Sequence, residues 1–209
     1  MIDVIPGILE KEWGTIEEKL RLVTGLVSWV QIGFADNTMV PNTTFLDVAK
    51  FAPYAKQFSL EAHLMVASPE KYVKKLADAG FKRLIAHVEA HDPRLFLDAV
   101  KYEQVETGIA IDAPTEFETV EPFLEEVDFV LVMMCEAGFS GQKFQPEQVE
   151  KIKSIHAYLP DLPIEVSGGI SDKTARLVVE AGATRLVSTS FLFEDPANIK
   201  GTIERLSNL

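Results

Sequence analysis

Short β-rich runs alternate with longer amphipathic segments from one end of the 209-residue chain to the other. The runs hold residues that favour strands, and the longer segments carry apolar residues at the three- and four-residue spacing of a helix. Strands are predicted at residues 3–6, 29–33, 59–65, 83–87, 106–111, 129–133, 164–166 and 185–187. Helices are predicted at residues 16–24, 44–51, 69–79, 94–100, 116–124, 146–158, 172–181 and 196–206.

This alternation predicts parallel strands, because a helical crossover returns the chain to the same end of the sheet. Eight strand–helix units favour a closed (β/α)8 barrel, the TIM barrel. The alternative is a flavodoxin-like doubly wound sheet, which usually has five or six strands. No low-complexity linker or shift in composition divides the sequence, so residues 1–209 are expected to form a single domain.

Charge and composition exclude several classes of partner. A net charge of −12 disfavours nucleic acid and anionic membrane surfaces, which need clustered Lys and Arg. No apolar run approaches the roughly 20 residues of a membrane span, and the start of the chain lacks the pattern of a signal peptide. The single cysteine, Cys135, cannot form an internal disulfide. We therefore expect a cytoplasmic protein that binds neither nucleic acid nor membranes.

Two segments near the end of the chain predict a phosphate site. Gly168 and Gly169 directly follow the seventh predicted strand, and Thr189 and Ser190 follow the eighth and are expected to open a short extra helix. TIM barrels commonly bind phosphate with the loops after these two strands. Gly141, in the loop after the sixth strand, offers a further backbone donor. The predicted partner is a small phosphorylated metabolite.

Several strings resemble ribulose-phosphate 3-epimerases, in the same order from Ile5 to Phe193. They are Val40-Pro41-Asn42, His63-Leu64-Met65-Val66, Leu131-Val132-Met133, Gly138-Phe139-Ser140-Gly141-Gln142-Lys143-Phe144 and Glu165-Val166-Ser167-Gly168-Gly169-Ile170. The resemblance implies a barrel of the ribulose-phosphate-binding type and a homo-oligomer. It also implies a reaction in which a proton moves at C3 of a pentulose 5-phosphate, through an enediolate on a divalent metal. In the family two aspartates act as acid and base, and they hold the metal together with two histidines.

The sequence departs from the family at these chemical positions. The family reads His-x-Asp-x-Met-Asp-Gly-x-x-Val-Pro-Asn where this chain has residues 31–42, so Gln31 replaces a histidine and Gly33 the first catalytic aspartate. Ser167 replaces the second aspartate, of the family's Val-Asp-Gly-Gly. Of the four ligand positions only His63 keeps a metal-binding residue, and one imidazole cannot hold a catalytic divalent ion. The sequence thus predicts no metal and no other cofactor.

The remaining mouth residues are expected to form the substrate pocket. They are Gly7, Gln31, Gly33, Met65, Met133, Gln142 and Ser167. Gly7 stands where the family has the serine of Pro-Ser-Ile-Leu. Together with Gly33 it is expected to enlarge the mouth.

Candidates for a replacement acid/base set are His63, His87, Asp36 and Asp112. His87 and Glu89 alternate along the end of a strand, so they would make a base with an orienting carboxylate, or a structural hydrogen bond. Asp36 has the alternative role of a loop cap. Asp112 and Glu136 are acids at positions where the family has asparagine, and they would rebuild an acid/base pair or else be solvated. Cys135 is expected to be a buried thiol.

The sequence therefore favours an epimerase-like protein that binds a phosphorylated sugar without the family's metal-dependent activity. Two alternatives stay open. One is an active sugar-phosphate epimerase or isomerase with a metal-free acid/base set, and the other is a non-catalytic sensor or partner subunit. The Asp-x-Lys-x-x-Asp string of related decarboxylating and condensing barrels is absent.

Overall fold

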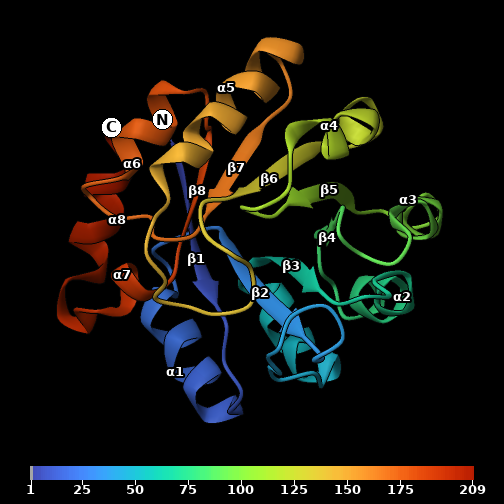
Figure 1. Ribbon diagram of the computed structural model, residues 1–209. Helices are drawn as coiled ribbons and strands as arrows, with labels where there is room; N and C mark the ends of the chain where they lie inside the picture. Colours follow the sequence, from blue (N-terminus) through green and yellow to red (C-terminus); the bar gives the residue numbers. More distant parts are fainter. Residues whose placement is uncertain (1) are drawn as a thin grey trace.

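The computed structural model describes residues 2–209, which form a closed barrel of eight parallel strands surrounded by helices (Figure 1). The strands are β1 (Asp3–Ile8), β2 (Trp29–Ala35), β3 (Ser59–Met65), β4 (Arg83–His87), β5 (Glu106–Ile111), β6 (Phe129–Met133), β7 (Ile164–Ser167) and β8 (Arg185–Ser188). Each strand pairs with the next, and β8 pairs with β1 to close the ring. The predicted TIM barrel is confirmed, and the open-sheet alternative is wrong.

The helices follow the strands in the predicted order. They are α1 (Trp13–Val23), η1 (Val48–Lys56), α2 (Glu70–Asp78), α3 (Pro93–Val100), α4 (Phe117–Val120), η2 (Glu121–Glu126), η3 (Pro146–Gln148), α5 (Val149–Tyr158), α6 (Ala175–Glu180), α7 (Ser190–Phe193), η4 (Pro196–Asn198) and α8 (Ile199–Ser207). The expected short extra helix after the last strand is α7.

The prediction of an α-helix at residues 44–51 is wrong. The segment after β2 is instead a 3-10 helix, η1, which starts four residues later and contains Pro53. Proline has no backbone N–H and its ring clashes with the preceding turn of an α-helix, so this segment does not continue as one. A second proline, Pro122, lies where the helix predicted at residues 116–124 splits into α4 and η2.

The core consists of an outer layer and an interior. Two large clusters of buried apolar residues fill the space between the strands and the helices. A third, smaller cluster comes from β2 to β6 and the loops that follow β2 and β6, and its centre includes Ile85, Ala110 and Leu131. The interior is thus packed rather than open, and the carboxyl ends of the strands carry the site.

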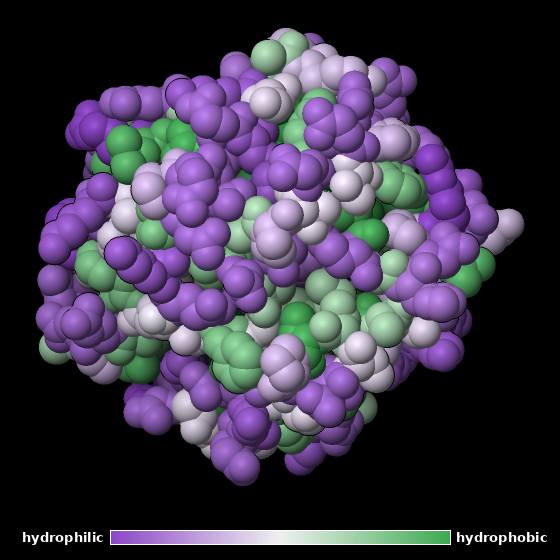
Figure 2. All heavy atoms as spheres, in the orientation of Figure 1, coloured by the Kyte–Doolittle hydropathy of each residue, from purple (hydrophilic) through white to green (hydrophobic). Residues whose placement is uncertain are grey.

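The surface is mostly polar. In Figure 2 hydrophilic residues cover most of the visible face, and hydrophobic residues appear in small separate groups. Among residues 2–209 no helix is long and apolar enough to cross a membrane.

Candidate functional site

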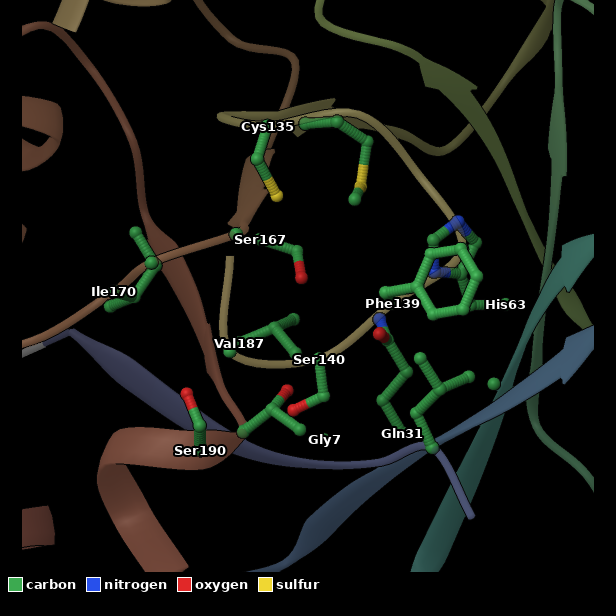
Figure 3. Close-up of a pocket in the computed structure, with 18 of the residues that line it drawn as sticks. Gly7, Gln31, His63, Cys135, Phe139, Ser140, Ser167, Ile170, Val187 and Ser190 are labelled. Atoms are coloured by element: carbon green, nitrogen blue, oxygen red, sulfur yellow. The ribbon is translucent and has the colours of Figure 1, made fainter. Parts of the chain in front are cut away.

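One cavity opens at the carboxyl ends of the strands (Figure 3). Its empty volume is about 580 Å³ when the space open to solvent is included. Twelve of the predicted site residues line it: Gly7, Gln31, Gly33, His63, Met65, Met133, Gly141, Ser167, Gly168, Gly169, Thr189 and Ser190. Gln142, His87, Asp36 and Asp112 are not among its lining residues.

The turn after β7 requires glycine at two successive positions. Gly168 and Gly169 have φ angles of 102° and 66°, in the left-handed region that side chains disfavour. A Cβ on Gly168 would stand 2.7 Å from the Cys135 Sγ atom, and one on Gly169 would stand 2.7 Å from the backbone nitrogen of Phe144. Neither glycine N–H bonds another protein group within residues 2–209. Two backbone donors therefore stand at the cavity with no competing acceptor.

The part of the cavity wall beside this turn carries hydroxyl groups. Thr189 and Ser190 line the cavity at the end of β8, where α7 begins, and Ser140 lines it from the β6–α5 loop. Figure 3 shows Ser140 and Ser190 on the same side of the cavity as the end of β8. Backbone N–H groups and hydroxyls in one place are the donors that a phosphate group needs.

The β6–α5 loop covers part of the mouth and is held by its own hydrogen bonds. Gln142 donates from Nε2 to the carbonyl oxygens of Glu136 at 2.5 Å and Phe139 at 3.1 Å. Asn42 donates to the Gly138 carbonyl at 2.6 Å. Gln142, placed in the pocket from sequence, therefore braces the loop instead, and it is Phe139 and Ser140 that line the cavity.

Gly7 and Gly33 do not enlarge the mouth, contrary to the sequence expectation. A Cβ on Gly33 would stand 2.5 Å from Leu9 Cδ1 and 3.2 Å from Met65 Cε. A Cβ on Gly7 would stand 2.9 Å from a methyl of Val187 and closer still to the Thr189 hydroxyl. Neighbouring side chains have taken the space that the glycines leave, because folded interiors do not tolerate voids.

The side-chain amide of Gln31 is already hydrogen-bonded to other side chains inside the barrel. This buried amide donates to Oε1 of Glu61 at 3.0 Å and to Oε1 of Glu165 at 2.9 Å. Burial and the charge of Glu61 raise the pKa of Glu165 well above its usual value. Burial also raises the pKa of Glu61, although Arg83 opposes this. Gln31 therefore joins two glutamates inside the barrel and also lines the cavity.

A chain of three side chains ends at the cavity wall. The Nε2 atoms of His63 and His87 lie 2.7 Å apart, and His87 Nδ1 lies 2.9 Å from a carboxylate oxygen of Glu89. Burial and the neighbouring His87 lower the pKa of His63 well below its usual value. Burial raises the pKa of Glu89, but the bonds from His87, Thr115 and the Asp112 N–H outweigh it, so the pKa falls to about 2. His63 is thus neutral and Glu89 ionised at neutral pH.

Asp36 does not belong to this cavity. Its carboxylate accepts from the Thr38 N–H at 3.1 Å and from the Tyr72 hydroxyl at 3.0 Å. These contacts hold the loop after β2 in its conformation. Asp36 therefore acts as a loop cap, the second of the two roles considered for it from the sequence. Burial and the bond to Asp36 raise the pKa of Tyr72 to about 12.

Asp112 and Glu136 do not face each other as an acid/base pair at the cavity. Asp112 accepts the N–H groups of Ala113 and Ala137, both at 2.8 Å, and burial raises its pKa. Glu136 is exposed and does not line the cavity. The neighbouring Cys135 does line it, as a thiol whose pKa is raised to about 11 by burial and by the charges of Asp112 and Glu136.

The residues present do not fit the metal that the resemblance implies. The four ligand positions hold Gln31, Gly33, His63 and Ser167, and all four line the cavity. Gln31 donates to two glutamates and His63 bonds His87. Among residues 2–209 no group of three or more His, Cys, Asp or Glu is arranged to bind a metal ion. One imidazole and one alcohol are too few for a divalent site.

Sequence reasoning missed two parts of the site. Leu9 closes the space beside Gly33, and its only sequence signal is its place two residues beyond Gly7. The interior pair Glu61 and Glu165 had a clearer signal, since each is a charged residue in the middle of an apolar predicted strand. A charge there indicates a buried polar partner across the barrel.

Known proteins are similar to this chain over nearly its full length. The model of the family described as "Ribulose-phosphate 3 epimerase family" matches residues 3–193. Ribulose-phosphate 3-epimerase of Bacillus subtilis is 34% identical over 203 residues, which cover 92% of this chain and 93% of the relative. The Schizosaccharomyces pombe enzyme is 32% identical over 196 residues, covering 91% and 86%. The enzyme named as the cytoplasmic isoform of Oryza sativa subsp. japonica is 32% identical over 198 residues, with the same coverage.

Solved structures agree on the fold. A 3-hexulose-6-phosphate synthase from Salmonella typhimurium superposes with a TM-score of 0.76 at 15% identity, covering 99% of this chain and 97% of that one. KGPDC from Streptococcus mutans gives a TM-score of 0.70 at 12% identity and covers 100% and 97%. Identities this low support the fold alone.

Proposed function

Because the chain belongs to the ribulose-phosphate 3-epimerase family, we propose that it binds a phosphorylated sugar at the barrel mouth without performing metal-dependent epimerisation. The observation that carries the proposal is an asymmetry within one cavity. The glycine turn and the hydroxyls on the side of β7 and β8 are present, whereas Gly33 and Ser167 stand where the family has its two acids.

The phosphate end of the ligand is assigned to Gly168, Gly169 and Ser190. The two glycine N–H groups have no protein acceptor within residues 2–209, so an anion would satisfy them. The net charge of −12 does not oppose this binding, because a small anion needs only local donors.

The sugar end is assigned to the cavity between His63 and Ser167. The Ser167 hydroxyl points into the cavity in Figure 3, and Met65 and Met133 supply apolar walls. Such a mixture suits a short polyol chain, whose hydroxyls need hydrogen bonds and whose carbons tolerate thioether contacts.

Loss of the family reaction follows from the chemistry of inversion. A proton must leave one face of the carbon and another must arrive on the opposite face. Both positions that hold acids in the family carry residues without an acid here, and the remaining donor set does not fit a metal to stabilise the enediolate.

Ligand binding and turnover are measured on the same purified protein. We expect ribulose 5-phosphate and ribose 5-phosphate to raise the melting temperature, and ribulose without phosphate to leave it unchanged. We expect no formation of xylulose 5-phosphate, with or without added Zn²⁺, Mn²⁺ or Fe²⁺. If no phosphorylated sugar stabilises the fold, the binding proposal fails. Rapid metal-dependent epimerisation would overturn the second half of the proposal.

The family relationship also supports a cytoplasmic homo-oligomer, as expected from the sequence. One relative carries the word cytoplasmic in its name. Sedimentation equilibrium of the purified chain tests the oligomer, and a monomer at micromolar concentration would contradict it.

A further inference from the structure

The hydrogen bonds from Glu89 to His63 determine where the protons lie. Glu89 accepts the Asp112 N–H on one oxygen at 2.9 Å and faces His87 Nδ1 with the other. Because this carboxylate is ionised at neutral pH, His87 must carry its proton on Nδ1. When the His87 ring holds this single proton, its Nε2 atom has a free lone pair, and the bond between the two rings is donated by His63 Nε2–H.

Among residues 2–209, this arrangement leaves one imidazole nitrogen at the cavity without a proton. With its proton on Nε2, His63 carries a lone pair on Nδ1. The Nδ1 atom of His63 makes no hydrogen bond to another group within residues 2–209. It is not fully buried either, so the cavity gives access to it. The rings of His63 and His87 stack with centroids 4.9 Å apart and planes at 17°, which holds His63 in place.

Two carboxylates near this chain, Glu89 and Asp112, favour a transient positive charge on it, whereas the nearby amine of Lys151 opposes that charge. Asp112, at the end of β5, is close enough for its pKa to respond to His87. Lys151 of α5 interacts with both Glu89 and Asp112, and it donates to the backbone carbonyl of Asp112 at 2.8 Å. A proton taken up by His63 can therefore be matched by transfer of the Nε2 proton to His87, beside the Glu89 carboxylate.

His63 can exchange a proton with a ligand from one wall of the cavity, and the opposite wall carries Ser167. In the closed ring β3 and β7 are four strands apart in either direction, so His63 and Ser167 stand on opposite walls. Within residues 2–209, the one other titratable side chain that lines the cavity is Cys135, which stays a thiol at neutral pH. A planar enediol intermediate would meet an acid/base group on one face and an alcohol on the other.

On this basis, and resting on the proposed sugar-phosphate site, we infer that His63 shifts a proton between C1 and C2 of a bound aldose or ketose phosphate without a metal. His87 and Glu89 are positioning residues. Such a shift needs a single group on one face, because the same nitrogen that removes a proton from one carbon can return it to the neighbouring carbon. The inference thus names an aldose–ketose isomerisation.

The step balances with water as the only co-reactant. His63 Nδ1 takes the proton from C1 of the ketose, the C–H electron pair forms the C1–C2 double bond, and O2 takes a proton from water. The O1 hydroxyl then returns a proton to water as its electrons form the new carbonyl, and Nδ1 gives its proton to C2. The Ser167 hydroxyl points into the same cavity, from where it would donate a hydrogen bond to the enediolate oxygen.

The experiment follows hydrogen exchange by NMR in D₂O with EDTA present, using ribulose 5-phosphate and ribose 5-phosphate as probes. We expect interconversion of the two sugars with deuterium at C1 and C2, no xylulose 5-phosphate, and no effect of EDTA. His63→Gln is expected to slow exchange by about 10²- to 10⁴-fold, the usual contribution of a general base, while the probes still raise the melting temperature. The matched control is His91→Gln, at an exposed histidine just beyond Glu89.

The positioning role is tested by the split between turnover and binding. Glu89→Gln can still accept hydrogen bonds but carries no charge. We expect it to lower kcat with KM and the thermal shift unchanged, and Glu89→Asp to restore part of the rate. A loss that came only from damage to the fold would instead lower the melting temperature and raise KM together.

The outcomes separate this inference from the proposed function. Probes that stabilise the protein but show no exchange at C1 or C2 would overturn the inference and leave the binding proposal standing. Exchange undiminished in His63→Gln, or exchange at C3 with xylulose 5-phosphate formed, would also overturn it. Failure of both probes to stabilise the protein would remove the proposed function and the inference with it.

Discussion

The Leu9 Cδ1 methyl lies 2.5 Å from the point where a Cβ on Gly33 would stand, and Met65 Cε lies 3.2 Å from the same point. Both atoms are the ends of flexible side chains. They crowd the point where this Cβ would stand, and rotation of both side chains would vacate it. The wall beside Gly33 is therefore apolar as the protein stands and not permanently closed.

Restoring the absent ligands is expected to create a metal site. Gln31→His, Gly33→Asp and Ser167→Asp together would add one imidazole and two carboxylates to His63, at four positions that line one cavity. We expect the triple variant to retain roughly one Zn²⁺ or Mn²⁺ per chain after dialysis and the unaltered protein to retain almost none. Elemental analysis measures both.

His63→Gln added to the triple variant serves as the control, and it should lower metal retention again. The triple variant is also expected to be less stable, by about 1–3 kcal/mol, because replacing Gln31 leaves oxygens of Glu61 and Glu165 without their donor. Near-stoichiometric metal in the unaltered protein would contradict the site described above.

The fold could be predicted because it depends on periodicity. The predicted bounds of β3, β4, β5 and β6 agree with the structure. The segment at residues 44–51 failed because its apolar spacing looks helical while Pro53, just beyond it, prevents a regular α-helix.

The site could be predicted only in part. The position of Gly168 and Gly169 at the cavity was identifiable because it depends on backbone geometry and on their place after a strand. The side chains of Asp36 and Asp112 were not, because a carboxylate at a strand end can equally face a ligand or accept the N–H groups of its own loop. Sequence spacing does not say which partner is nearer.

Removing one hydroxyl is expected to weaken phosphate binding without affecting the fold. A hydrogen bond to a charged group contributes about 1.5–3 kcal/mol, so Ser190→Ala should raise the Kd for ribose 5-phosphate by roughly tenfold or more. Calorimetric titration measures this change. Ser28→Ala, at an exposed serine just before the amino end of β2, is the matched control and should bind normally. Equal affinity of the two variants would remove Ser190 from the site.

Cys135 is expected to react slowly although it lines the cavity. Burial, with the charges of Asp112 and Glu136, raises its pKa from 9.0 to about 11, so the thiolate fraction at about pH 8 falls by roughly 100-fold. Mass spectrometry after iodoacetamide treatment should show alkylation about two orders of magnitude slower than for an unstructured peptide thiol. Rapid alkylation would mean that the thiolate is stabilised, which the surrounding carboxylates argue against.

The interior pair Glu61 and Glu165 makes stability depend on pH. Because the pKa of Glu165 is raised well above 4.5, the folded state holds this proton more tightly than the unfolded chain does. The resulting stabilisation is fully present below the unfolded pKa, and it is lost as the pH rises through the folded pKa. Ionising this buried carboxyl group therefore lowers the free energy of unfolding near neutral pH.

Glu165→Gln is expected to remove that dependence. The amide keeps an oxygen to accept the Gln31 N–H, but it has no proton to lose. We expect the variant to melt several degrees above the unaltered protein at about pH 8, at about 2–4 °C for each kcal/mol, with the difference shrinking towards about pH 5. Glu18→Gln, at an exposed position on α1, should follow the unaltered protein at every pH. Parallel melting curves for Glu165→Gln and the unaltered protein would mean that Arg83 and Arg185, which lower the pKa of Glu165, offset its burial completely.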